Sequence, residues 1–318
     1  MMSTSAYQLI RLRNGAVSVR SLTDGETFHP GIGPEAEADA LYVRQLRLPE
    51  RLAAADEELV VWDVGLGAGA NTLTALRRMA EALAVSPSPN PRRVQCISFD
   101  RTDAALRFAR AHAEHLGYLN GFVPFVDELL IAQRVSFFHG LLTVNWSLVL
   151  GDFPTLVGAP TTASLPPPHA ILYDPHSPRA NPAMWTVPLF AGLHRRLDPQ
   201  RPCALATFSR STAARAALLL GGFYVGVGHA TGLKEETTVA ATGLALLAEP
   251  LGHRWLERAR RSDSAEPLWT PTYRRERLRE ETWDRLRNHP QFAGAAAECR
   301  GEGVNFSRST GPARRPGS

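Results

Sequence analysis

The sequence predicts a doubly wound α/β fold, in which helices cover both faces of a mostly parallel sheet. The first observation is the apolar run 59–64, which a glycine-rich turn joins to a helical pattern at 71–84. The second is the alternation of strand-like and helix-like segments from there to about residue 220. The third is a pair of strand-like segments, 223–227 and 237–241, which predicts a terminal antiparallel hairpin.

The length and composition are those of a globular protein. With 318 residues, 44% of them apolar, the chain can bury a large core, and no apolar run approaches the roughly 20 residues of a membrane helix. The start Met1–Ser5 lacks a signal-peptide pattern. Cys96, Cys203 and Cys299 are far apart and no Cys/His cluster has zinc-ligand spacing. We therefore expect a cytoplasmic protein without a disulfide framework, a metal or a membrane anchor.

The N-terminal segment, residues 1–50, is expected to lie across the mouth of the core as a lid. Two alternating stretches flank Asn14-Gly15, which predicts a hairpin, and 35–46 has the composition of a helix.

The core domain is expected to span residues 51–249. Its predicted strands are 59–64, 94–99, 141–150, 170–173 and 203–208, and its predicted helices are 71–84, 102–115, 182–197 and 209–220.

The composition changes after residue 250, where arginines interleave with glutamates and tryptophans. We expect an arginine-rich helical extension at 250–300 and a disordered tail at 301–318. Arginines among aromatic residues could hold RNA. Alternatively, the helices pack back on the core or on a second subunit, which would make the protein a homodimer.

The glycine turn has the spacing G-x-G-x-G, formed by Gly65, Gly67 and Gly69, with Asp63 two positions before it. Strand, glycine turn and helix together are typical of a site for a nucleotide-like ligand, because glycine lets the backbone approach the ligand closely. A glycine turn without a ligand is the alternative.

Two acidic residues follow later strands. Asp100 could accept hydrogen bonds from ribose hydroxyls or could cap the next helix. Asp152 could accept from an adenine amino group or could be a solvent-facing turn residue.

Lys234 is the only lysine in a chain whose other basic residues are arginines. A compact cation at this position could hold a phosphate or close a pocket. A surface lysine on the terminal hairpin is the alternative.

The glycine spacing resembles motif I of the class I S-adenosyl-L-methionine (SAM)-dependent methyltransferases, whose sheet has seven strands. That resemblance implies SAM as the cofactor. The residues expected to hold it are Asp63, Gly65, Gly67, Gly69, Asn71, Asp100 and Asp152.

The segment 170–185 resembles the bacterial methyltransferases that complete 5-methylaminomethyl-2-thiouridine at the tRNA wobble position. The matching residues are Asp174, Pro178, Asn181, Pro182, Met184 and Trp185, and the resemblance extends over roughly residues 28–242. The family usually has Asp-Gly-Phe where this chain has Asp174-Pro175-His176, and often Lys-Arg-Glu at 234–236 where it has Lys-Glu-Glu. The resemblance implies tRNA as substrate and a separate enzyme that supplies the aminomethyl group.

The chemistry of amine methylation fits this segment. An alkyl-ammonium with a pKa near the ≈10.4 of lysine is protonated at neutral pH, so the site must help to remove a proton and orient the amine. Asp174, with the carbonyl of Pro175, could do so. His176 could be a second proton acceptor or only a loop residue, and Trp185 could stack on the target base or lie in the core. Methylation of another amine or small molecule, or a non-catalytic SAM- or RNA-binding scaffold, is the alternative function.

Overall fold

The central sheet has eight strands in the order β5-β6-β4-β3-β7-β8-β10-β9. In this computed structural model the described residues are 6–55, 58–86, 91–232 and 234–293. The strands are β3 (Glu58–Val64), β4 (Arg92–Asp100), β5 (Arg134–His139), β6 (Leu142–Leu150), β7 (Ala170–Tyr173), β8 (Ala204–Thr207), β9 (Tyr224–Gly228) and β10 (Thr237–Ala241). The five strands β6, β4, β3, β7 and β8 are parallel, and β10 and β9 form the antiparallel hairpin that the sequence predicts.

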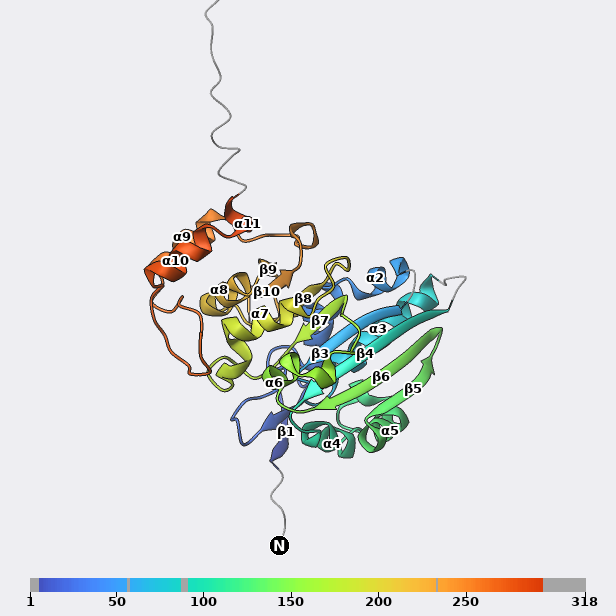
Figure 1. Cartoon of the computed structure of the whole chain (residues 1–318). Coiled ribbons are helices and arrows are strands. Elements are labelled where there is room, and N and C mark those ends of the chain that lie inside the picture. The colour runs from blue at the N-terminus through green and yellow to red at the C-terminus, as the bar shows by residue number, and fades with distance from the viewer. Residues whose placement is uncertain (1–5, 56–57, 87–90, 233, 294–318) are drawn as a thin grey trace, which may run out of the picture.

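Helices cover both faces of the sheet (Figure 1). One face carries α1 (Pro34–Ala38), a π-helical turn η1 (Asp39–Arg44), α2 (Leu48–Ala54), α3 (Ala70–Val85), α4 (Ala104–Ala111) and α5 (Val123–Ala132). The other carries α6 (Phe153–Gly158), the 3-10 turn η4 (Pro182–Trp185), α7 (Val187–Arg195) and α8 (Thr212–Leu220). The fold class is therefore confirmed.

Strand β3 shows why its apolar run lies in the middle of the sheet. Leu59 and Val61 pack into the core on one face, whereas Val60, Trp62 and Val64 pack into the core on the other. Side chains of a strand alternate between faces, so a strand covered on both sides must be apolar at consecutive positions.

Several elements differ from the sequence-based expectation. The antiparallel edge strand β5 makes the sheet eight-stranded rather than seven-stranded, and α2, α5 and α6 were not expected. Helix α5 turns into β5 through the single residue Gln133, whose φ is +57°, without a glycine or proline to mark the boundary. The helix expected at 182–197 is divided at Thr186, whose extended backbone ends η4 and whose hydroxyl caps α7.

The N-terminal segment begins with the hairpin of β1 (Tyr7–Arg11) and β2 (Val17–Ser21), which form a small sheet of their own. The helix expected at 35–46 is present as α1 followed by η1. The segment that follows the hairpin contributes to the wall of the main cavity described below.

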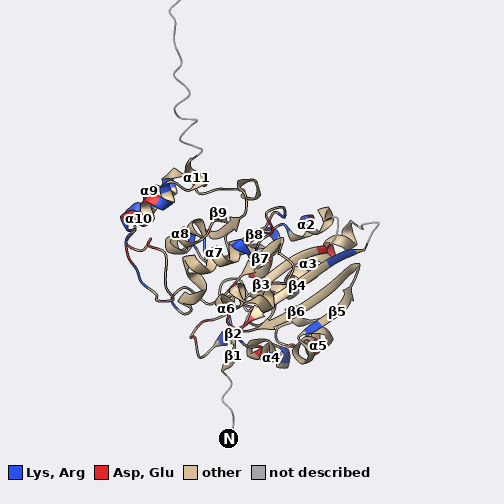
Figure 2. Cartoon of the chain, in the orientation of Figure 1, with Lys and Arg blue, Asp and Glu red and all other residues tan. Residues whose placement is uncertain are grey.

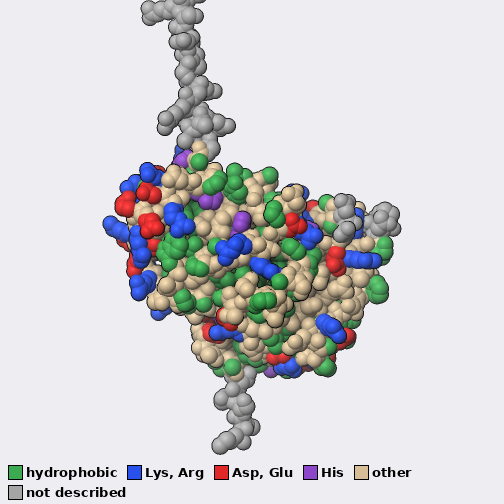
Figure 3. Space-filling view, viewed as in Figure 1, with side chains coloured by type: hydrophobic (Ala, Val, Ile, Leu, Met, Phe, Trp, Pro, Cys, Tyr) green, Lys and Arg blue, Asp and Glu red, His purple; other side chains and the backbone are tan. Residues whose placement is uncertain are grey.

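The C-terminal extension contains α9 (His253–Arg261), α10 (Glu280–Arg287) and α11 (Pro290–Ala293). These helices bury Trp255, Trp283 and Phe292 in the core on the α7–α8 side of the sheet. The extension therefore packs back on the core, as one of the two alternatives for it predicts. Arg260 lies 4.6 Å from the centre of the Trp283 ring. Basic and acidic side chains alternate over α9 and α10 (Figures 2 and 3). The tail at 301–318 lies outside the described residues, and the homodimer and the domain boundaries stay predictions.

Gln291 ties this extension to the sheet, and its loss should destabilise the whole fold. Its side chain accepts from the Val225 amide at 2.7 Å and donates to the carbonyls of Val225 and Leu251 at 2.7 and 2.8 Å. Gln291→Leu would leave the Val225 amide and the Leu251 carbonyl unpaired, at about 1–3 kcal/mol for each, whereas the Val225 carbonyl still accepts from the Leu251 amide. We expect urea denaturation to show a loss of at least about 2 kcal/mol. The exposed control Gln200→Leu should be neutral, and equal stability of both variants would contradict this anchoring role.

None of the described helices is long and apolar enough to cross a membrane. Cys96 and Cys203 are buried free thiols, and Cys299 lies outside the described residues.

Candidate functional site

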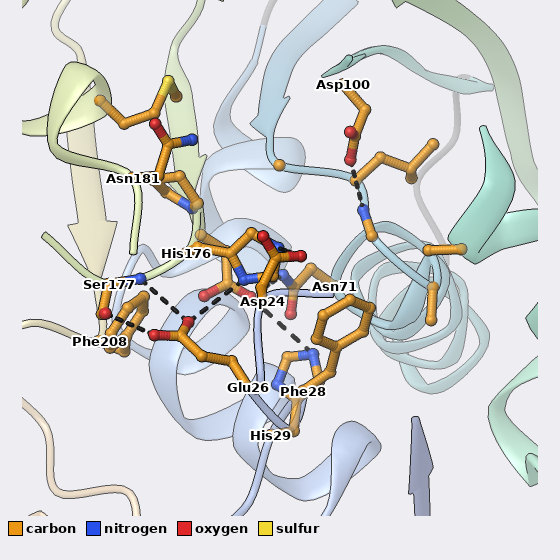
Figure 4. A pocket seen from close by; sticks show the side chains of 18 of the residues that line it. Asp24, Glu26, Phe28, His29, Asn71, Asp100, His176, Ser177, Asn181 and Phe208 are labelled. Carbon is orange, nitrogen blue, oxygen red and sulfur yellow. Dashed lines mark hydrogen bonds and ion pairs between the residues drawn. The ribbon is translucent and has the colours of Figure 1, made fainter. Parts of the chain in front are cut away.

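The main cavity lies at the carboxyl ends of the parallel strands, where doubly wound folds bind ligands (Figure 4). Its volume of about 410 Å³ is in the range of small-molecule sites. Residues of the glycine turn, of the ends of β4, β6 and β7, and of the N-terminal segment line it. Of the predicted site residues, this wall includes Gly65, Gly67, Asn71, Asp100, Asp152, Asp174, Pro175, His176 and Lys234.

The glycine turn needs glycine at all three positions. Gly65, Gly67 and Gly69 have φ angles of +92°, +52° and +81°, a region that other residues rarely occupy. A Cβ atom on Gly65 would lie 2.7 Å from the Asp174 carbonyl oxygen, so the turn after β3 touches the loop after β7. Gly69 caps α3 and faces Leu106 rather than the cavity.

Asp63 lies behind the turn and not on the cavity wall. Its carboxylate accepts hydrogen bonds from the Thr72 hydroxyl at 2.7 Å and from the Ser98 hydroxyl at 3.0 Å. Burial raises the pKa of Asp63 to about 7, although these two hydrogen bonds lower it. The contacts are those of a residue that positions β3 against α3.

Asp100 and Asp152 both reach the cavity while supporting their own loops. Asp100 accepts from the Gly67 amide at 2.9 Å, and burial raises its pKa. It does not cap α4, whose N-cap is Asp103. Asp152 caps α6 and accepts from the Thr155 hydroxyl at 2.9 Å.

The described residues fit SAM. Gly65 and Gly67 line the cavity with backbone alone, and a Cβ on Gly67 would point at the cavity residue Phe28. The amide oxygen of Asn71 is buried with no hydrogen-bond partner among the described residues. Asp100 and Asp152 supply acceptors for hydroxyl and amino groups, and Phe99 and Phe153 supply apolar wall. The glycine turn would face the amino-acid part of the cofactor, and the two aspartates its nucleoside part.

Asp174 directly follows β7, and neighbouring elements hold it. Its backbone amide donates to the Val64 carbonyl at 2.9 Å, and its Oδ2 accepts from the Asn71 amide at 2.7 Å. Tyr42 is fully buried nearby, and burial together with the Asp174 charge raises its pKa well above the usual value. Asp174 is thus oriented at the junction of the glycine turn and the β7 loop.

His29 is a cavity residue that the sequence-based reasoning missed. Its Nε2 lies 3.9 Å from Asp174 Oδ2, and its Nδ1 lies 3.7 Å from Glu37 Oε2 (Figure 4). Its φ of +49° is unusual for a histidine. Glu37 accepts from the amides of Gly31 and Ile32, and burial raises its pKa. The stretch 28–34 is rich in glycine and proline, which predicts irregular backbone but gives no sign that His29 faces the cavity.

His176 joins the segment 174–185, which follows β7, to the N-terminal segment. Its Nδ1 lies 3.2 Å from Glu26 Oε2 and its Nε2 lies 3.2 Å from Asp24 Oδ2 (Figure 4). The Ser177 amide also donates to Glu26, at 3.1 Å. We call these four residues the loop latch. The His176 hydrogen bond contributes most to lowering the pKa of Glu26 to about 2. Burial alone would lower the pKa of His176, but Glu26, Asp24 and Asp100 raise it.

The loop latch should stabilise the fold in a pH-dependent way. The raised pKa of His176 gives stability that is complete below its unfolded value of 6.5 and is lost as the pH rises through the folded pKa. The lowered pKa of Glu26 gives stability that is present above 4.5 and is lost as the pH falls toward 2. We therefore expect His176→Phe to cost about 1–3 kcal/mol near pH 5–6 and less at pH 8.

Thermal unfolding of wild type and His176→Phe across this pH range measures the effect. The exposed control His115→Phe should leave the stability profile unchanged. A destabilisation by His176→Phe that is the same at pH 5.5 and pH 8 would contradict the ionic latch.

Trp185 and Lys234 have different surroundings. Trp185 is 1% exposed, contacts Tyr173, Phe190 and Phe208, and donates to the His176 carbonyl at 2.9 Å. These contacts favour the core alternative over base stacking. Lys234 lies on the cavity wall, where its Nζ donates to the Phe208 carbonyl at 3.0 Å and lies 4.3 Å from the centre of that ring. Burial lowers its pKa, which Asp174 and Glu37 partly restore.

No group of three or more possible metal ligands occurs among the residues that the structure describes.

Comparisons with known proteins indicate the same cofactor that fits the main cavity. A model of the S-adenosyl-L-methionine-dependent methyltransferases matches residues 131–243. The chain is 29% identical over 210 residues to the tRNA 5-methylaminomethyl-2-thiouridine biosynthesis bifunctional protein MnmC of Burkholderia mallei, covering 63% of the chain and 30% of that protein. It is also 29% identical over 226 residues to the protein of the same name from Aeromonas hydrophila, covering 67% of the chain and 32% of that protein. The chain thus spans about a third of the length of these relatives.

A solved structure supports the fold. The crystal structure of MNMC2 from Aquifex aeolicus aligns with a TM-score of 0.62 and 22% identity, covering 90% of this chain and 86% of that one. Over residues 131–243 the chain therefore matches the S-adenosyl-L-methionine-dependent methyltransferases, and it is similar to the MnmC proteins over the part of them that it spans.

Proposed function

We propose that this protein methylates a primary amine, the 5-aminomethyl group of the wobble uridine of tRNA. The observation that carries the proposal is the position of Asp174. Its carboxylate is oriented by Asn71 on the wall of the cavity, and its loop touches the glycine turn. The printed names of the relatives, which concern tRNA 5-methylaminomethyl-2-thiouridine, support this choice of amine.

The residues around Asp174 suit the removal of a proton from an ammonium group. Bound SAM supplies an electrophilic methyl group, which only the neutral amine can attack. The Asp174 carboxylate accepts a hydrogen bond from the amine and orients its lone pair. His29, 3.9 Å from Asp174, offers a second acceptor, and Glu37 lies beyond it at 3.7 Å. We propose that the proton leaves the amine along this row of three side chains.

Lys234 is proposed to close the cavity above the amine. Its ammonium group uses one of three donors on the Phe208 carbonyl and has two left for the substrate.

Methylation of a different amine is the second candidate. The loop that follows Asp174 has Pro175 and His176 where the related wobble-uridine enzymes usually have glycine and phenylalanine. In this chain His176 is bound to Glu26 and Asp24, so the N-terminal segment shapes the substrate side of the cavity. The third candidate is a scaffold that binds SAM or RNA without catalysing a reaction.

Methyl transfer from labelled SAM distinguishes these functions. The substrates are tRNA that carries 5-aminomethyl-2-thiouridine, the same tRNA with unmodified uridine, and small primary amines. The proposal predicts a far higher kcat/KM for the first than for the small amines, and no transfer to the tRNA with unmodified uridine. Transfer to small amines with no reaction on the modified tRNA would support the second candidate, and SAM binding without transfer to any of them would support the scaffold.

The cellular setting follows from this substrate. We propose that the protein acts in the cytoplasm on tRNA whose aminomethyl group a separate enzyme has made.

A further inference from the structure

A second cavity lies on the other side of the segment 174–185, which follows β7 and carries Asp174, and which we call the catalytic loop. Its volume is about 220 Å³. The residues that line it come from the catalytic loop, the start of α8 and the segment between α9 and α10, and include Pro178, Trp185, Ser211, Tyr273, Arg274 and Arg275. We call this cavity the arginine groove.

The groove and the main cavity share the catalytic loop as a wall. Ser177 lines the main cavity and Pro178, the next residue, lines the groove. Their Cα atoms are about 3.8 Å apart, less than the length of one nucleotide. At the other end of the loop, Met184 lines the main cavity and Trp185, the next residue, lines the groove. A nucleotide in the groove would therefore be a neighbour of the one in the main cavity.

The rim of the groove is strongly basic. Arg274 and Arg275 line it, and Arg179 and Arg210 are exposed next to the lining residues Pro178 and Ser211. In the described part of the chain no ion pair involves Arg179, Arg210 or Arg275, whereas Arg274 lies 3.7 Å from Glu276. Many other arginines of the extension are engaged with acidic or aromatic side chains, as Arg260, Arg277, Arg279, Arg285 and Arg287 show.

Tyr273 adds an aromatic surface to this charge. It is 42% exposed, one of the few large apolar side chains of the described residues with so much surface. A flat ring beside planar guanidinium groups matches the two needs of a single-stranded nucleotide, which are stacking of the base and binding of the phosphate.

We propose that the arginine groove binds the nucleotide adjacent to the modified one in single-stranded RNA, with its base on Tyr273 and its phosphates on Arg274 and Arg275. The inference rests on the proposed function and deepens it. It also explains how a small cavity selects a tRNA loop, because the flanking nucleotide supplies affinity that a free nucleoside lacks.

The test compares two substrates, a stem-loop RNA with 5-aminomethyl-uridine in its loop and the single nucleoside 5-aminomethyl-uridine. Arg274→Gln/Arg275→Gln should raise KM for the stem-loop about tenfold and leave kcat/KM for the nucleoside unchanged. The logarithmic salt slope of RNA binding should fall by about 1.4, which is 0.7 for each of two phosphates. Tyr273→Ala should also raise KM for the stem-loop, whereas Tyr273→Phe should behave like wild type because the ring remains.

The matched control is Arg93→Gln/Arg134→Gln, which removes the same charge from exposed positions on β4 and β5, in the other half of the sheet. Groove variants with the KM and salt slope of this control would overturn the inference, and so would an equal loss on the nucleoside. Wild-type protein that binds the stem-loop but transfers no methyl group would instead refute the proposed function. A third outcome would assign the groove to an acidic protein and overturn the inference. In that case polyglutamate inhibits stem-loop methylation by the wild type and not by the groove variants, and the groove variants bind RNA as tightly as the wild type.

Discussion

Asp174→Asn is expected to lower kcat for methyl transfer by about 10²–10⁴-fold while SAM still binds. Asparagine keeps the size of the side chain but cannot accept a proton from the ammonium group. The Asn71 amide, which donates to Asp174 Oδ2 at 2.7 Å, can still donate to an amide oxygen, so the loop should keep its position. Single-turnover rates on aminomethylated tRNA and SAM titration by calorimetry measure the two properties separately.

Asp284→Asn is the control for this change, because Asp284 is exposed on α10 and pairs only with the exposed Arg287 among the described residues. The pH profile gives a further readout. If Asp174 takes the proton, the variant should regain part of its rate at high pH, where more of the amine is already neutral. A variant with the wild-type rate at pH 7 would show that Asp174 is not the proton acceptor.

Gly65→Ala is expected to abolish measurable SAM binding and methyl transfer. Two penalties combine at this position. A φ of +92° costs a residue with a Cβ about 1–2 kcal/mol. The Cβ would also lie 2.7 Å from the Asp174 carbonyl oxygen and 3.0 Å from the Pro175 nitrogen, so the glycine turn and the catalytic loop must separate. Because both form walls of the cavity, the cofactor and the amine sites are displaced together.

Gly15→Ala separates the two penalties. Gly15 has a similar φ of +88°, but nothing lies within 4 Å of the place where its Cβ would be. Both variants should therefore lose a similar amount of stability to backbone strain, whereas only Gly65→Ala should lose SAM binding. Calorimetric titration and thermal unfolding test this directly. Tight SAM binding by Gly65→Ala would show that the turn does not form the cofactor cradle.

Local sequence patterns were sufficient to predict most strands of the sheet. The apolar run at 59–64 must be covered on both faces, and G-x-G-x-G permits positive φ angles that other residues avoid. Both properties belong to a few consecutive residues. Strand β5 was missed because it lacks such a local pattern. No local signal separates it from α5, and its pairing with β6 is a tertiary contact.

The main cavity shows where local reasoning ends. Sequence alone determined that a glycine turn, Asp100 and Asp174 each follow a predicted strand, and parallel strands end at the same edge of a sheet. Only the tertiary structure decided that His29 reaches Asp174, that His176 is held by Glu26, and that Trp185 is buried. These contacts join residues up to 150 positions apart. Such distances leave no periodicity or spacing in the chain, because they depend on how the N-terminal segment packs over the finished sheet.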